Sequence, residues 1–330
     1  MFGAAGHTGR FVVEELYRRG WTPVLAGRDA GKLRALHEAH PASEVRVASV
    51  DDAAGLDDVL RDARAVINCA GPFLDTATPI IEAALRARAH YLDVTAEQAA
   101  ALAAFERFPA DAAAVGVAIV PAMAFYGGLA DLLATAAMTG LAAADDIRIA
   151  IAIDSWQPTR GTRLTGERNT VPRVVVSGGR LQPLDTAAPA AAWRFPDPFG
   201  VQEMARVPFS EIITISRHLR SQEIHTYLNL ASLKDVNDPT TPPPTPSDAS
   251  GRSAQTFAME VVVRAGRDER RASARGRDIY AVTAPLVVEA AERILDGRSR
   301  RAGVAAPGAL FDAREFLAAL TPQHLSVEIS

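Results

Sequence analysis

Three glycines at three-residue intervals open the chain: Gly3, Gly6 and Gly9 stand directly before an amphipathic stretch. Glycines at this spacing let a tight turn bring the backbone close to a pyrophosphate, and the N-terminus of the following helix presents free N–H groups. The stretch is followed by a strand-like run ending in Ala26-Gly27-Arg28, where the ribose of a dinucleotide would lie. The sequence therefore predicts a Rossmann-type dinucleotide site, with His7 and Thr8 beside the three glycines.

The rest of the first half alternates short apolar runs with stretches of helical periodicity. This alternation is typical of a parallel sheet covered by helices. We predict an α/β, doubly wound domain over residues 1–125, joined by a returning C-terminal segment over 277–330. Its expected strands are 23–26, 45–50, 65–70, 91–94 and 117–120.

After residue 138 the strand-like runs are mostly separated by turn-rich segments, which predicts a second, mainly antiparallel α+β domain over residues 126–276. Consecutive prolines in 238–253 predict a surface loop inside that domain. A helix is expected from Thr283, because Pro285 is best tolerated in a first turn. The expected strands are 147–153, 173–176, 223–228, 257–264 and 270–274.

Composition limits the class of protein. A chain of 330 residues suits two domains, and its net charge of -4 without a basic block makes nucleic acid an unexpected partner. The single Cys69 and the absence of a signal segment favour the cytoplasm. The apolar run 112–144 is long enough to cross a bilayer, but Pro121 and the Gly127-Gly128 pair divide it into a buried strand and a core helix, so no membrane span is expected. A homodimer built on the second sheet is expected only by analogy.

Arg28 favours NADP(H), because a guanidinium suits a 2′-phosphate, whereas Asp29 beside it leaves NAD(H) open. Ligands of doubly wound sheets gather beyond the carboxyl ends of the strands. We therefore expect Asp51 near the adenine and the turn Ala70-Gly71-Pro72 where the cofactor crosses the sheet.

Four segments together resemble the saccharopine dehydrogenase-like family, including its bacterial relatives described as trans-acting enoyl reductases. They are GAAGHTGR at 3–10, VLAGRD at 24–29, INCAGPF at 67–73 and HYLDVTAE at 90–97, with weaker similarity at 121–131 and 278–284. The resemblance implies NADP(H) binding by the glycine loop and hydride transfer at the cleft that faces the second domain.

The chain departs from the family pattern in two places. Only Met1 and Phe2 precede Gly3, where the family has a full strand, so either the start is assigned too far downstream or the cofactor loop is poorly supported. Ala122 and Ala124 replace a glycine-rich pattern, and Tyr126 stands where the family often has aspartate.

Candidate proton donors follow the last expected strand of the first domain. Tyr126 and Asp131 lie there, although packing explains the tyrosine equally well. A carboxylate on a helix surface or a salt bridge is the commoner explanation for the aspartate. A Tyr-x-x-x-Lys dyad is absent, and the histidines show no metal-ligand spacing, so no metal is expected.

The segment 160–169 gathers three arginines in a glycine-containing loop that could clamp a substrate carboxylate or phosphate through Arg163 and Arg168. A solvated loop is the alternative. Tyr280 is expected to contact the cofactor or substrate from the returning segment, although packing alone could account for it.

The sequence as a whole predicts an NADPH-dependent reductase that acts on an activated C=C or C=N bond of a small or carrier-linked substrate. A non-catalytic dinucleotide sensor and a cofactor-retaining epimerase remain the alternatives.

Overall fold

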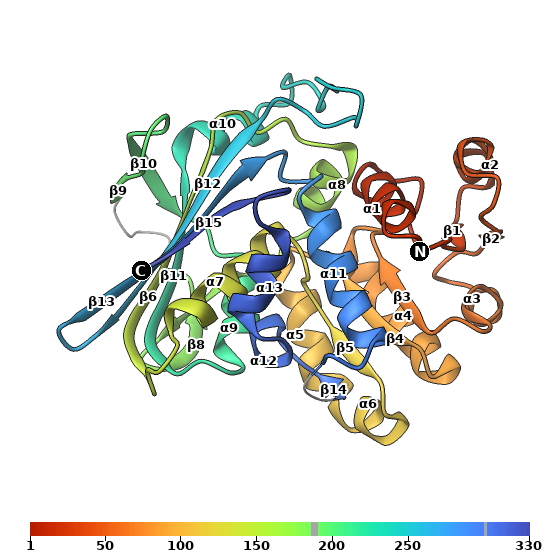
Figure 1. Cartoon of the computed structure of the whole chain (residues 1–330), viewed down its shortest axis with the longest axis horizontal. Coiled ribbons are helices and arrows are strands. Elements are labelled where there is room, and N and C mark those ends of the chain that lie inside the picture. Colours follow the sequence, from red (N-terminus) through yellow and green to blue (C-terminus); the bar gives the residue numbers. More distant parts are fainter. Residues whose placement is uncertain (186–190, 300–301) are drawn as a thin grey trace.

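A computed structural model describes residues 1–185, 191–299 and 302–330. The strands of these residues form two sheets, counting as one the strand groups that Phe2 bridges, and helices pack between the two sheets (Figure 1). The smaller parallel sheet belongs to the N-terminal domain, and the larger mixed sheet to the segment that follows it.

The N-terminal domain is the predicted Rossmann-type sheet, and its strands are parallel. They are β1 (Leu25–Gly27), β2 (Val45–Val47), β3 (Ala65–Asn68), β4 (His90–Asp93), β5 (Ala118–Val120) and β14 (Gly303–Val304).

The place of a first strand is taken by one residue, Phe2. Its N–H donates to Ile67 and its carbonyl accepts from Cys69, both at 2.9 Å, while the Ala26 N–H donates to Met1. Phe2 thus bridges β1 and β3. This short bridge sets the glycine loop at the centre of the sheet.

Helices cover the faces of this sheet, as the apolar spacing predicted. Asp29 and Asp52 cap α2 and α3 by accepting the N–H groups of Lys32 and Gly55. The helices are α1 (His7–Arg18), α2 (Ala30–Ala39), α3 (Ala53–Leu60), α4 (Phe73–Ala87), α5 (Gln98–Arg107) and α6 (Pro109–Val115).

The second sheet has two parallel strands at its centre, β6 (Ala144–Ile153) and β11 (Ser221–Asn229), whereas its other strand pairs are antiparallel. One face carries alternate apolar side chains such as Ile149, Ile151 and Val261 into the core. The remaining strands are β7 (Val174–Ser177), β8 (Arg180–Pro183), β9 (Ala191–Arg194), β10 (Val201–Arg206), β12 (Thr256–Ala265), β13 (Asp268–Arg277) and β15 (Ser326–Ile329).

The helices between the sheets hold the domains together (Figure 1). The returning helix α11 (Thr283–Leu295) begins where Pro285 predicted and packs on α1. Its companions are the π-helix η1 (Phe125–Leu129), α7 (Ala130–Ala137), α9 (Glu211–Ser216), α12 (Pro307–Leu310) and α13 (Ala313–Leu320).

The apolar run 112–144 divides as predicted, into β5 and the buried helices η1 and α7. Within the described residues, no helix has both the length and the apolar character that crossing a membrane requires. Gly127 makes the sharp η1 turn possible, because a Cβ there would lie 2.3 Å from the carbonyl oxygen of Ala122.

The prediction of a loop over 160–169 is wrong: residues Arg160–Arg168 form helix α8. Thr159 caps it by accepting the N–H of Thr162, and its arginines and glutamate are good helix formers that outweigh Gly161 and Gly166. The helix α10 (Leu230–Asn237) leads into the proline-rich segment, which is an exposed loop as expected.

Candidate active site

A cavity of about 320 Å³ lies between the two domains, at the carboxyl ends of β3, β4 and β5. The Rossmann domain contributes Thr8, Cys69 and Gly71 to its wall. The second domain contributes Tyr126, Trp156 and Arg173. The cavity is therefore lined both by the edge of the sheet where this fold binds a dinucleotide and by residues of the second domain.

The glycine loop fits a pyrophosphate. A Cβ on Gly9 would lie 2.1 Å from the Gly3 carbonyl oxygen, and one on Gly3, whose φ is +76°, would lie 2.7 Å from the Ala70 nitrogen. Gly6 begins α1 without a side-chain cap, so the first N–H groups of this 12-residue helix are left for a ligand. The residues present thus form a cradle that only glycine allows.

The turn after β3 is held by the buried Asn68. Its Oδ1 accepts the N–H of Ala70 at 2.9 Å, and the Thr76 hydroxyl donates to the Ala70 carbonyl at 2.6 Å. Gly71 faces α8, because a Cβ on it would lie 3.3 Å from the Thr165 hydroxyl oxygen. Ala70, Gly71 and Pro72 therefore lie beside the glycine loop, and burial raises the pKa of the neighbouring Cys69 thiol, which argues against a nucleophilic role.

The adenosine end of the predicted site is open to solvent. Arg28 is exposed directly after β1, while Asp29 uses its carboxylate to cap α2. Asp51 is exposed as well, and its carboxylate accepts a hydrogen bond from the Ser49 hydroxyl. Arg28 is thus the basic side chain nearest in sequence to the end of β1.

His7 packs on Tyr280, which lines the cavity. Their rings meet edge to face with centroids 5.2 Å apart, and burial lowers the pKa of His7. The Tyr280 hydroxyl accepts from the Trp156 indole N–H at 3.0 Å and pairs with the Thr162 hydroxyl at 2.9 Å. Tyr280 therefore links the returning segment to α8 and lines the cavity with them.

Tyr126 lies in the cavity wall, stacked on Phe209 with centroids 4.0 Å apart. Its hydroxyl is buried and has no hydrogen-bond partner among the residues that the structure describes. Burial raises the pKa of Tyr126 well above 10, and Tyr280 and Glu211 add to the rise. The phenol is therefore protonated, and no described residue accepts its proton.

Arg173 is a lining residue that the sequence prediction missed, since we expected it only to start a strand. Its guanidinium lies 5.2 Å above the Phe209 ring and donates to the Pro208 carbonyl at 3.3 Å. Burial lowers the pKa of Arg173, although Glu211 opposes this. No ion pair joins it to a carboxylate within residues 1–185, 191–299 and 302–330. The sequence feature that could have pointed to Arg173 as a site residue is its position as a charged residue between Pro172 and an apolar strand.

Asp131 does not line this cavity. It is fully buried in α7, where its Oδ1 accepts the Gly308 N–H at 2.9 Å and lies 2.9 Å from the His218 Nε2. The structure thus matches the pairing alternative for Asp131 rather than proton donation.

Arg163 and Arg168 do not line it either. Arg163 donates to the carbonyls of Asp238 and Thr241, and Arg168 pairs with Asp75 of α4 at 2.8 Å. The cavity side of α8 instead presents Gly161, Thr162, Thr165 and Gly166. Helical periodicity separates these two sets of residues, which a loop would not have done.

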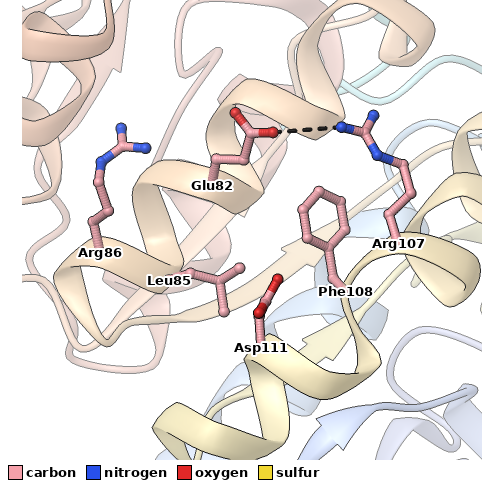
Figure 2. Close-up of a pocket in the computed structure, with 6 residues that line it drawn as sticks. All are labelled: Glu82, Leu85, Arg86, Arg107, Phe108 and Asp111. Atoms are coloured by element: carbon pink, nitrogen blue, oxygen red, sulfur yellow. Dashed lines mark ion pairs between the residues drawn. The ribbon is translucent and has the colours of Figure 1, made fainter.

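A separate hollow lies beside the last turns of α4 (Figure 2). Its wall carries Glu82 and Arg86 of α4, Arg107 of α5, Asp111 of α6, and Phe108 between these last two helices. Glu82 pairs with Arg107 at 3.5 Å, and Arg86 pairs with Asp57 at 2.7 Å. These exposed charges neutralise each other, so the interdomain cavity is the stronger candidate.

Comparisons with known proteins agree with the glycine cradle. Residues 1–120 match the family model described as the saccharopine dehydrogenase NADP binding domain. The saccharopine dehydrogenase-like oxidoreductase of Bos taurus is 32% identical over 150 residues, and that of Homo sapiens is 35% identical over 115 residues. These alignments cover 40% and 29% of this chain, respectively, and only 35% and 27% of the relatives' own lengths.

The fold extends further than the sequence similarity. Saccharopine dehydrogenase (L-Glu forming) from Saccharomyces cerevisiae matches with a TM-score of 0.68 at 12% identity, over 100% of this chain and 98% of that one. The predicted resemblance and the predicted nicotinamide dinucleotide are thereby confirmed for the N-terminal domain, and the overall fold is similar to that of the yeast protein.

Proposed function

We propose that this chain, whose residues 1–120 match the family model of the saccharopine dehydrogenase NADP binding domain, is an NADP(H)-dependent oxidoreductase that reduces an activated C=N or C=C bond. One observation carries the proposal. Among the described residues, the buried Tyr126 hydroxyl in the cavity wall has no hydrogen-bond partner, and the Arg173 guanidinium in the same wall has no ion pair with a carboxylate.

The cofactor would be held by Gly3, Gly6 and Gly9 at α1 and by the Ala70–Pro72 turn, and it supplies the hydride when bound. A hydride added to one end of a double bond leaves an electron pair at the other end, which needs a proton. In this proposal Tyr126, which lines the cavity, donates that proton, and solvent supplies a new proton to the phenolate afterwards. The net change adds two hydrogens to the substrate.

Arg173 supports an anionic substrate. A guanidinium above an aromatic ring, partly withdrawn from water and without a carboxylate partner in the described chain, gains most from a bound carboxylate or phosphate. The neighbouring walls are mainly apolar, with Phe209, Val207 and Leu233 among them. The best-fitting substrate thus carries an anionic group on an apolar body.

The test follows NADPH absorbance with a panel of carboxylate-bearing imines, enals and enoyl thioesters. We expect at least one member to be reduced, and we expect Arg173→Gln to lower its kcat/KM by about tenfold to a hundredfold, the usual effect of one charge-assisted contact. The methyl ester of the same compound is the control, because Arg173→Gln should lower its kcat/KM far less. NADPH that binds but is oxidised by no member would leave a dinucleotide sensor instead.

A further inference from the structure

Glu97 is a buried carboxylate that lines the cavity, and the sequence prediction gave it no role. It is 1% exposed and follows β4. One of its oxygens accepts the N–H of Phe73 at 2.7 Å, and the other accepts the N–H of Leu74 at 2.9 Å. Helix α4 has Pro72 as its N-cap and no local side-chain cap, so Glu97 caps it from a distant part of the chain.

These two bonds fix the far end of the Gly71-Pro72 turn. Phe73 and Leu74 follow that turn directly, and Asn68 holds its near end through the N–H of Ala70. Glu97 also occupies the positive end of α4, which leaves α1 as the helix terminus open to the pyrophosphate. Asn68 and Glu97 therefore hold the two ends of a turn that lines the cavity through Gly71.

Gln98, the next residue, holds the opposite wall. Its amide donates to the carbonyls of Val174 and Phe209 at 2.8 Å and 3.0 Å, and its oxygen accepts the Val174 N–H. Val174 adjoins Arg173, and Phe209 stacks on Tyr126. Two neighbouring side chains thus anchor the cofactor wall and the substrate wall separately.

We propose that Glu97 is a positioning residue that holds the Gly71-Pro72 turn in the shape that receives the nicotinamide half of NADP(H). The inference rests on the proposed function. Glu97 acts through the backbone of α4, so its loss should affect the nicotinamide half of the ligand and spare the adenosine half.

The experiment compares two ligands by fluorescence and calorimetric titration of the full chain. NADPH occupies both halves of the site, whereas 2′,5′-ADP occupies the adenosine half only. For Glu97→Gln we expect the Kd of NADPH to rise about tenfold and that of 2′,5′-ADP to change less than about twofold, since an amide nitrogen now faces a backbone N–H.

Gln98→Ala is the matched control, because it removes a neighbouring buried side chain of similar size that anchors the other wall. It should leave the ratio of the two dissociation constants as in the wild type. Glu97→Asp, which keeps the charge but retracts it, should shift the ratio by about threefold and serves if Glu97→Gln does not fold.

Three outcomes would overturn the inference: an unchanged ratio in Glu97→Gln, an unchanged ratio in Glu97→Asp where that variant carries the test, or an equal change in Gln98→Ala. A wild-type chain that binds neither ligand would overturn the proposed function itself, which is a different result.

Discussion

At the scale of single residues, the site depends on side chains whose ordinary partners are missing. In the part of the chain that the structure describes, the Tyr126 hydroxyl has no hydrogen-bond partner, and the Arg173 guanidinium forms no ion pair with a carboxylate. The sequence predicted Tyr126 because it follows the last strand, but it favoured Arg163 and Arg168 over Arg173. Arginines are visible in a sequence, whereas the partners that occupy them come from segments far along the chain, such as Asp75 for Arg168.

Arg28→Ala is expected to raise the KM for NADPH about tenfold and to change the KM for NADH less than about twofold, because a guanidinium binds the 2′-phosphate that NADH lacks. Steady-state kinetics with both cofactors measure this. The control is Arg34→Ala, which removes a second exposed arginine, one that lies on α2. It should leave both constants unchanged. Equal effects of Arg28→Ala on the two cofactors would contradict the assignment.

Tyr126→Phe is expected to lower kcat by about a hundredfold or more, the usual contribution of a positioned acid. The melting temperature should stay the same or rise, because the lost hydroxyl is buried without a described partner. Turnover and thermal unfolding of the same preparation give the two readings. A variant that keeps full turnover would remove Tyr126 from the reaction.

At the scale of helices and strands, apolar runs predicted the central strands of both sheets, because burial on two faces leaves an unmistakable pattern. The edge strands β8 and β9, and the strand β10 that pairs with β9, were missed, since partly exposed runs such as Ala191–Arg194 carry no such pattern. Helix α8 was missed for a different reason. All nine of its residues remain partly accessible, so no apolar stripe announces it, and a cap at Thr159 is the only local sign.

Gly9→Ala tests the glycine cradle as an element. An added Cβ would lie 2.1 Å from one backbone oxygen and 2.9 Å from another, and neither can move without opening the loop. We expect NADPH binding to fall below detection and stability to fall by about 1–3 kcal/mol, as for overpacked sites. Chemical denaturation and titration check both. Gly31→Ala in α2 meets no backbone atom and should be as stable as the wild type or more so. NADPH binding retained by Gly9→Ala would argue against the cradle.

At the scale of the whole molecule, stability should depend on pH through Glu211 in the core of the second domain. Burial raises its pKa from 4.5 to about 7, even though Thr226 and the Phe209 N–H donate to it. Between these values the unfolded chain has released the proton that the folded chain keeps, so stability falls as pH rises from 4.5 to 7 and is level above. The loss is on the order of 3 kcal/mol.

Glu211→Gln should abolish that loss, because the amide keeps the acceptor oxygen and cannot ionise. Urea unfolding at pH 5 and pH 8 measures the free energies of wild type and variant. The free energy of unfolding of the variant, relative to that of the wild type, should be higher at pH 8 than at pH 5. A constant difference between the two proteins would show that Glu211 does not titrate in this range.

The single-residue bridge at Phe2 has a mechanical consequence. Strands β1 and β2 join the remainder of their sheet through Phe2 and its neighbours, so the line between β1 and β3 is a seam along which the domain can open locally while the rest stays folded. A dinucleotide lying across that seam would tie the adenosine side to the nicotinamide side. Binding of the dinucleotide would then be linked to closure of the seam. The domain would resist local opening most strongly when the dinucleotide is bound.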